Sequence, residues 1–150
     1  MGMSTLTIDE LTEIVIRCAI AVHDALGPGL LESIYRDCLV IELRANGLTA
    51  ELEKRVSIVY RGQQVGGALR IDILVDGRLV IEVKAVDHLH PVFQAQVITY
   101  LKLTGHPAGL ILNFNALSMR AGIRRVDRPD LYAKKRAARV GIQRPESARS

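Results

Sequence analysis

The chain has 150 residues, of which 49% are hydrophobic, and it carries a formal net charge of +4 at pH 7. This size and composition fit a single domain with one hydrophobic core. No apolar run approaches the length that crosses a bilayer, so we expect no membrane partner, and the two cysteines cannot provide the four ligands of an iron–sulfur cluster.

The charge is distributed unevenly along the chain. Residues 1–119 contain 10 Lys and Arg against 13 Asp and Glu, whereas residues 120–150 contain 10 against 3. We therefore expect a globular domain over 1–132 and a basic C-terminal tail over 133–150. The tail points to a polyanionic partner, and the alternative is a solvated terminus.

The cysteines and the N-terminus bear on location. Cys18 and Cys38 lie far apart in apolar helical contexts, which indicates reduced core residues and a cytoplasmic protein. The first residues lack a basic start and an apolar core, so no signal peptide is expected.

Two helices are predicted first. Thr7 and Glu10 have the spacing of a capping box, so the first helix should begin at Thr7. Its predicted buried stripe contains Leu11, Ile14, Cys18, Val22 and Leu26. A second helix over about residues 30–45 should end at Asn46-Gly47. One face of this helix contains Leu31, Ile34, Cys38 and Ile41, and Glu32 and Tyr35 lie on an adjoining face.

The central segment is residues 70–87, RIDILVDGRLVIEVKAVD. It follows a strand predicted over 49–61, and its two alternating runs, separated by Asp76-Gly77, predict a β-hairpin with one buried face. A two-residue turn would send Asp72 and Glu82 to opposite faces, which the apolar pattern forbids. We therefore expect a three-residue loop with Gly77 in the left-handed region.

This register brings charged side chains together on the other face of the hairpin. Asp72 and Glu82 become near neighbours, and two close carboxylates repel unless a proton or a cation lies between them. A hard divalent cation such as Mg²⁺ prefers carboxylate oxygens and water. Lys84 faces the same place, with Arg70 beside it, so the pattern predicts a metal site next to an ammonium group. The structural alternative is an exposed salt-bridge network.

The remaining elements complete an α/β sheet. Pro91 can occupy the first turn of a helix that ends at Gly105, the apolar run over 108–114 suits a strand buried on both faces, and 123–126 can add an edge strand. An antiparallel meander, a helical crossover and a buried strand imply a mixed sheet flanked by helices.

The hairpin residues resemble a known signature. Asp72, followed after nine residues by Glu82-Val83-Lys84, is similar to the D…(D/E)xK pattern of the PD-(D/E)xK nuclease superfamily. Gln96-x-x-x-Tyr100 resembles the Q-x-x-x-Y element of some of its members. The segment Gly29–Tyr35, GLLESIY, resembles the motif of the GxxExxY family within that superfamily, and the likeness extends over about residues 14–126.

This resemblance implies a restriction-endonuclease-like fold and a set of roles. Asp72 and Glu82 would bind Mg²⁺ or Mn²⁺, with the Val83 carbonyl and Glu32, directly or through water, as further ligands. Lys84 would position the attacking water. Gln96 and Tyr100 would hold the phosphate or the metal shell, with Arg70 and Tyr35 as substrate contacts. Tyr35 and Tyr100 can equally be core tyrosines, and Arg70 can serve only to neutralise the carboxylates.

The implied function is a metal-dependent nuclease acting on DNA. A single domain of this size usually needs help to choose its substrate, so a homodimer or a larger protein partner is expected. The alternative is a catalytically silent module of the same fold that binds nucleic acid or acts as a scaffold. His88-x-His90 provides only two candidate zinc ligands, and carboxylates favour a harder ion.

Overall fold

The computed structural model describes residues 5–66 and 69–130; the predicted basic tail, 133–150, lies outside the described residues. The elements in chain order are α1 (Ile8–Leu26), α2 (Glu32–Ala45), β1 (Ala50–Val56), β2 (Val59–Tyr60), β3 (Gln63–Gln64), β4 (Leu69–Val75), β5 (Leu79–Lys84), α3 (Pro91–Thr104), β6 (Ala108–Asn113), the 3₁₀ turn η1 (Met119–Gly122) and β7 (Ile123–Asp127). Within this part of the chain, no helix combines the length and apolar character needed to cross a bilayer.

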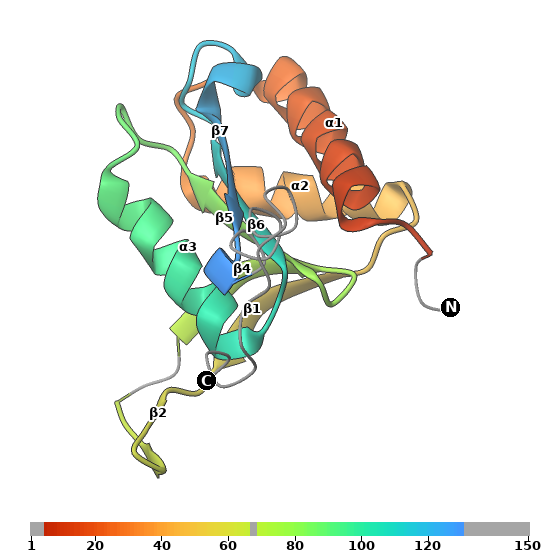
Figure 1. Cartoon of the computed structure of the whole chain (residues 1–150). Helices are drawn as coiled ribbons and strands as arrows, with labels where there is room; N and C mark the ends of the chain where they lie inside the picture. The colour runs from red at the N-terminus through yellow and green to blue at the C-terminus, as the bar shows by residue number, and fades with distance from the viewer. Residues whose placement is uncertain (1–4, 67–68, 131–150) are drawn as a thin grey trace, which may run out of the picture.

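The main sheet has five strands in the order β1-β4-β5-β6-β7. The strands β1, β4 and β5 form an antiparallel meander, and β6 then pairs parallel to β5 after the α3 crossover. The last strand, β7, returns antiparallel to β6 at the edge. The helices α1 and α2 cover one face of this sheet, and α3 covers the other (Figure 1). The predicted mixed α/β sheet flanked by helices is therefore confirmed.

The register of the β4–β5 hairpin also matches the prediction. Val75 pairs with Leu79, which leaves a three-residue loop between them. Gly77 has a φ of 65°, in the left-handed region where glycine carries no steric penalty. Asp76 also has a positive φ, 50°, and its carboxylate accepts hydrogen bonds from the amide and the hydroxyl of Thr49.

The prediction of a single buried face on this hairpin is wrong. Ile73 and Ile81 pack into the core under α1 and α2, as expected, but Leu74 and Val80 are buried in a second core under α3. Ile71 also belongs to the second core. The cause is the crossover helix α3, which buries the sheet face that the charged residues were expected to expose to solvent.

The helix boundaries were predicted better than the helix faces. Thr7 caps α1 in a capping box with Glu10, as predicted. On the predicted apolar face of the second helix, however, Leu31 and Ile41 are 71% and 68% exposed, although Cys38 packs against the core. The buried residues of α2 are Tyr35, Leu39, Val40 and Leu43. Leu26, at the end of α1, is also exposed rather than part of the core.

The strand predicted over 49–61 is two strands. β1 ends at Val56, and β2 forms a separate two-stranded sheet with β3. We call the segment from Ser57 to Val65, which contains both strands, the arm. It extends away from the body of the molecule at the end opposite α1 (Figure 1).

Candidate metal centre

The centre lies where β4 and β5 separate. The last paired residues of the hairpin are Ile73 and Ile81, and the register places Asp72 opposite Glu82 one step further on. At this step the carboxylate of Asp72 accepts a hydrogen bond of 2.9 Å from the Val83 amide. The Val83 amide thus bonds to the Asp72 side chain instead of to a backbone carbonyl of β4. This hydrogen bond fixes the Asp72 carboxylate at the opening between the strands.

Glu82 is a buried carboxyl group with an unusual pKa. The residue is 6% exposed, and burial, followed by the negative charge of Asp72, raises its pKa to about 7. Among the described residues its Oε1 is a buried polar atom without a hydrogen-bond partner. An unsatisfied buried acceptor costs about 1–3 kcal/mol, so this oxygen is available for a proton or a cation. Burial also raises the pKa of Asp72.

Lys84 and α3 form one side of the centre. The Lys84 ammonium lies 3.8 Å from Glu82 Oε2 and 4.3 Å from the centre of the Phe93 ring. Burial, followed by the charges of Glu82 and Asp72, raises the pKa of Tyr100 on α3, so its hydroxyl lies within electrostatic reach of both carboxylates. The side chain of Gln96, one helical turn earlier, is exposed and makes no hydrogen bond within the described residues.

A cavity of about 210 Å³ forms the other side, toward α2. A water molecule takes about 30 Å³ of liquid volume, so the cavity has room for several waters or a phosphate group. Asp72 and Val83 line it from the sheet, Glu32 and Arg36 line it from α2, and Arg70 lines it from the outer end of β4. The cavity is therefore lined by both acidic and basic side chains.

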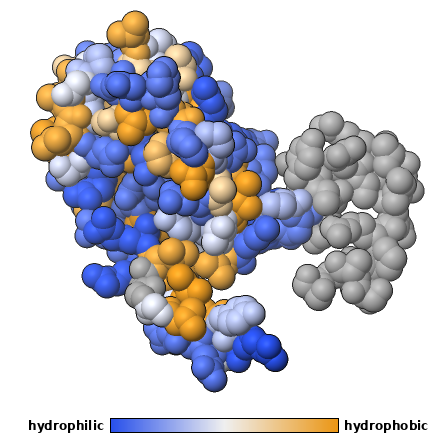
Figure 2. Space-filling model, turned by 90° about the vertical axis from the view of Figure 1, so that its left-hand side faces the viewer, coloured by the Kyte–Doolittle hydropathy of each residue, from blue (hydrophilic) through white to orange (hydrophobic). Residues whose placement is uncertain are grey.

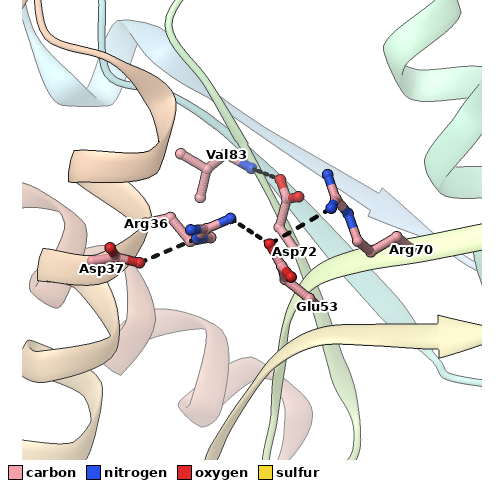
Figure 3. A network of polar contacts seen from close by, with 6 residues as sticks. All are labelled: Arg36, Asp37, Glu53, Arg70, Asp72 and Val83. Carbon is pink, nitrogen blue, oxygen red and sulfur yellow. Dashed lines mark hydrogen bonds and ion pairs between the residues drawn. The ribbon is translucent and has the colours of Figure 1, made fainter.

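The charges at this cavity are organised around Glu53 (Figure 3). Its Oε1 lies 2.9 Å from Arg36 and 3.6 Å from Arg70, so one carboxylate holds two guanidinium groups next to Asp72. Glu53 has a φ of 51°, a conformation that non-glycine residues rarely adopt. It stands opposite Asp72 in the β1–β4 register, where no pair forms, so the distortion of β1 coincides with the centre.

Glu32 does not complete a three-carboxylate cluster. Its Oε1 accepts a hydrogen bond of 3.3 Å from the Ala85 amide. Among the residues that the structure describes, no three His, Cys, Asp or Glu side chains are grouped closely enough to hold a metal ion. Glu32 still raises the pKa of both Asp72 and Glu82 by its charge. Its position fits a contact through water better than direct binding.

The carboxylate pair nevertheless fits a small hard cation. Asp72 and Glu82 offer oxygen donors, one of them the unpartnered Oε1 atom. Mg²⁺ typically keeps several waters and takes one or two carboxylates from the protein, with substrate phosphate oxygens completing its shell. Two carboxylates, one of which lines a cavity with room for several waters, match this pattern, whereas zinc sites usually include nitrogen or sulfur ligands. His90, one of the two candidate zinc ligands, instead caps α3 by accepting from the Val92 amide.

Tyr35 is a core residue, which is the alternative that the sequence left open beside a substrate contact. It is 0% exposed, and its ring stacks on Phe114 at 4.7 Å. Its hydroxyl donates to the Gly27 carbonyl and accepts from the Leu30 amide. These two hydrogen bonds fix the loop between α1 and α2, which leads directly into Glu32.

Sequence reasoning missed Arg36 and Glu53. Arg36 had a usable signal, because it follows Glu32 by four residues and so lies on the same helical face. Glu53 had none, because its carboxylate meets arginines from two other elements, Arg36 on α2 and Arg70 on β4, and its backbone is left-handed.

Comparison with known proteins gives one match. The family model described as the PD-(D/E)XK nuclease superfamily matches residues 9–126. The matched part includes both carboxylates, Lys84, the cavity and all of α3. No curated protein and no solved structure matches the chain.

Proposed function

This chain belongs to the PD-(D/E)XK nuclease superfamily, and we propose that it is a divalent-metal-dependent nuclease that hydrolyses DNA phosphodiester bonds at the Asp72–Glu82 centre. The Gly29–Tyr35 segment supports its placement in the GxxExxY family. We also propose a cytoplasmic location, in keeping with the free thiols of Cys18 and Cys38.

One observation carries the proposal. Glu82 is buried opposite Asp72, has a pKa of about 7 and keeps one oxygen without a partner among the described residues. Such an arrangement costs stability in the empty protein. A carboxyl group with these properties is typical of a functional site rather than of a structural ion pair.

The side chains around the pair divide the work of hydrolysis. Asp72 and Glu82 would hold Mg²⁺ or Mn²⁺, with the Val83 carbonyl and, through water, Glu32 as further ligands. A bound divalent ion polarises the phosphoryl oxygen and makes hydroxide easier to form. The Lys84 ammonium orients the attacking water and stabilises the charge that develops on the phosphate.

The remaining predicted residues lie at the edges of the centre. The Tyr100 hydroxyl, whose pKa is raised by burial and then by the charges of Glu82 and Asp72, would bind a phosphate oxygen or a water of the metal shell. Gln96, exposed one turn earlier on the same helix, would contact the same phosphate. Arg70 lines the cavity and is only loosely paired with Glu53, so it can contact the nucleic-acid backbone.

The test is cleavage of labelled linear, nicked and branched DNA in Mg²⁺, Mn²⁺ or EDTA. We expect cleavage with a divalent ion, none in EDTA, and none by Asp72→Asn. The matched control is Asp24→Asn, which removes an exposed carboxylate on α1. Binding without cleavage under all conditions would contradict the proposal and indicate a silent binding module.

A further inference from the structure

Of the residues that the structure describes, none in the arm belongs to either hydrophobic core. All four residues of β2 and β3 are exposed, with Val59 at 57% and Tyr60 at 68%. The hairpin is closed by its own ladder and by a hydrogen bond from the Val65 amide to the Ile58 carbonyl. In the space-filling view the protruding segment at the bottom carries both apolar and strongly hydrophilic surface (Figure 2). A projecting hairpin of this kind is available to bind a partner.

The charge of this region has one sign. From Arg55 to Arg70 the sequence contains three arginines, the third being Arg61, and no Asp or Glu. Within the described part of the chain, neither Arg55 nor Arg61 makes an ion pair. These two guanidinium groups are therefore free to bind an external anion.

Two of the arginines lie directly opposite each other on the neighbouring strands β1 and β4. Arg55 pairs with Arg70 in the antiparallel β1–β4 ladder, and like charges directly opposite one another destabilise a sheet. Arg70 shares its counter-ion, Glu53, with Arg36, which lies closer to the Glu53 carboxylate. The positive charges of Arg55 and Arg70 are thus only partly balanced by Glu53, and a bound anion would reduce the repulsion between them.

Arg61 occupies a backbone position that disfavours it. The turn of the arm consists of Arg61, with a φ of 49°, and Gly62, with a φ of 80°. Turns with two positive φ values favour Asn or Asp at the first position, because those side chains tolerate the left-handed region. Arginine is costlier here, yet it places a guanidinium at the tip of the arm.

The three arginines lead outward from the cavity. Arg70 lines the cavity together with Asp72, and Arg55 shares its sheet face because the two are cross-strand partners. Arg61 follows Arg55 by six residues, a distance of at most about 20 Å in extended chain. Duplex DNA rises about 3.4 Å per base pair, so this length corresponds to at most about six base pairs.

We propose that Arg70, Arg55 and Arg61 form a phosphate-binding track that holds the backbone of a nucleic acid on one side of the scissile bond. This inference rests on the proposed nuclease function and adds to it a binding site on the arm. The contacts are to phosphate groups, so they are independent of base sequence and sensitive to salt. The arm lengthens the bound segment beyond what the cavity alone can hold.

The test measures binding apart from turnover. A fluorescent 20-base-pair duplex is titrated in EDTA with the unaltered chain, Arg55→Gln, Arg61→Gln, the double variant and the control Arg17→Gln, which removes an exposed arginine on α1. We expect each arm substitution to weaken binding about two- to five-fold, as for an exposed ion pair. Each should also reduce the slope of log K against log salt by about one. Arg17→Gln should change neither quantity.

The outcomes separate this inference from the proposed function. Unchanged affinity and salt slope in the double variant would overturn the track, even if the protein cleaves DNA in Mg²⁺. Weakened binding by the arm variants in a protein that never cleaves would support the track and contradict the hydrolysis. Equal weakening by Arg17→Gln would show only a general effect of net charge and would also overturn it.

Discussion

Glu82 lies opposite Asp72 at the open end of the β4–β5 hairpin, and burial together with the charge of Asp72 raises the pKa of Glu82 to about 7. At neutral pH Glu82 is therefore close to half protonated, and a cation could replace this proton. In the proposed function a divalent ion would bind the deprotonated pair, so protons and the metal would compete for the same site.

Replacing Glu82 with Gln should remove a pH dependence of stability. The folded state holds this proton with a pKa of about 7, against 4.5 for an ordinary Glu. The proton therefore stabilises the fold fully below pH 4.5, and this contribution is lost as the pH rises through 7. The difference corresponds to about 3 kcal/mol. Urea unfolding in EDTA should show the unaltered chain losing more stability than Glu82→Gln between pH 5 and pH 8. Parallel losses in the two proteins would contradict the assignment.

Replacing Lys84 with Met should affect turnover more than binding. Methionine keeps an unbranched apolar side chain at this position but removes the ammonium that lies over the Phe93 ring and beside Glu82. Positioned proton-transfer and water-orienting groups contribute about 10²- to 10⁴-fold to rates, so single-turnover cleavage should slow by that factor. Affinity for DNA should change by less than ten-fold. Lys102→Met, at an exposed position on α3, is the matched control, and cleavage by Lys84→Met at the unaltered rate would exclude a catalytic role.

Replacing Tyr35 with Phe should lower stability and leave the reaction unchanged. The substitution removes the hydrogen bonds to the Gly27 carbonyl and the Leu30 amide but keeps the stacking on Phe114. Loss of two such bonds costs about 1–3 kcal/mol in the free energy of unfolding, which denaturant titration can measure. Cleavage per folded molecule should match that of the unaltered chain. A higher KM of Tyr35→Phe without any loss in its free energy of unfolding would instead support Tyr35 as a substrate contact.

The sequence predicted the backbone of this protein well, for local reasons. The capping box at Thr7, Pro91 in the first turn of α3 and Gly105 after its end are short-range signals, and each marks a real helix boundary. The three-residue hairpin loop followed from the demand that apolar residues share a face. The same requirement places Asp72 opposite Glu82, so the central carboxylate pair of the candidate site could be predicted from the sequence.

The faces of the elements were less predictable, because packing between distant segments decides them. The predicted apolar face with Leu31 and Ile41 has helical spacing, but both of these residues are exposed because the buried Tyr35 and Leu39 orient the helix. Periodicity alone cannot choose between two apolar stripes on one helix. Glu53 itself has a left-handed backbone and pairs with Arg36 and Arg70 from two other elements, and no spacing rule indicates either feature.

The central claim is that Asp72 and Glu82 together hold one divalent ion, and Mn²⁺ binding followed by electron paramagnetic resonance at pH 8 tests it most directly. We predict one tightly bound Mn²⁺ per unaltered chain, retained by Asp24→Asn and displaced by excess Mg²⁺. Asp72→Asn and Glu82→Gln should each lose this ion. Mn²⁺ binding of equal strength and stoichiometry in all four proteins would contradict the account.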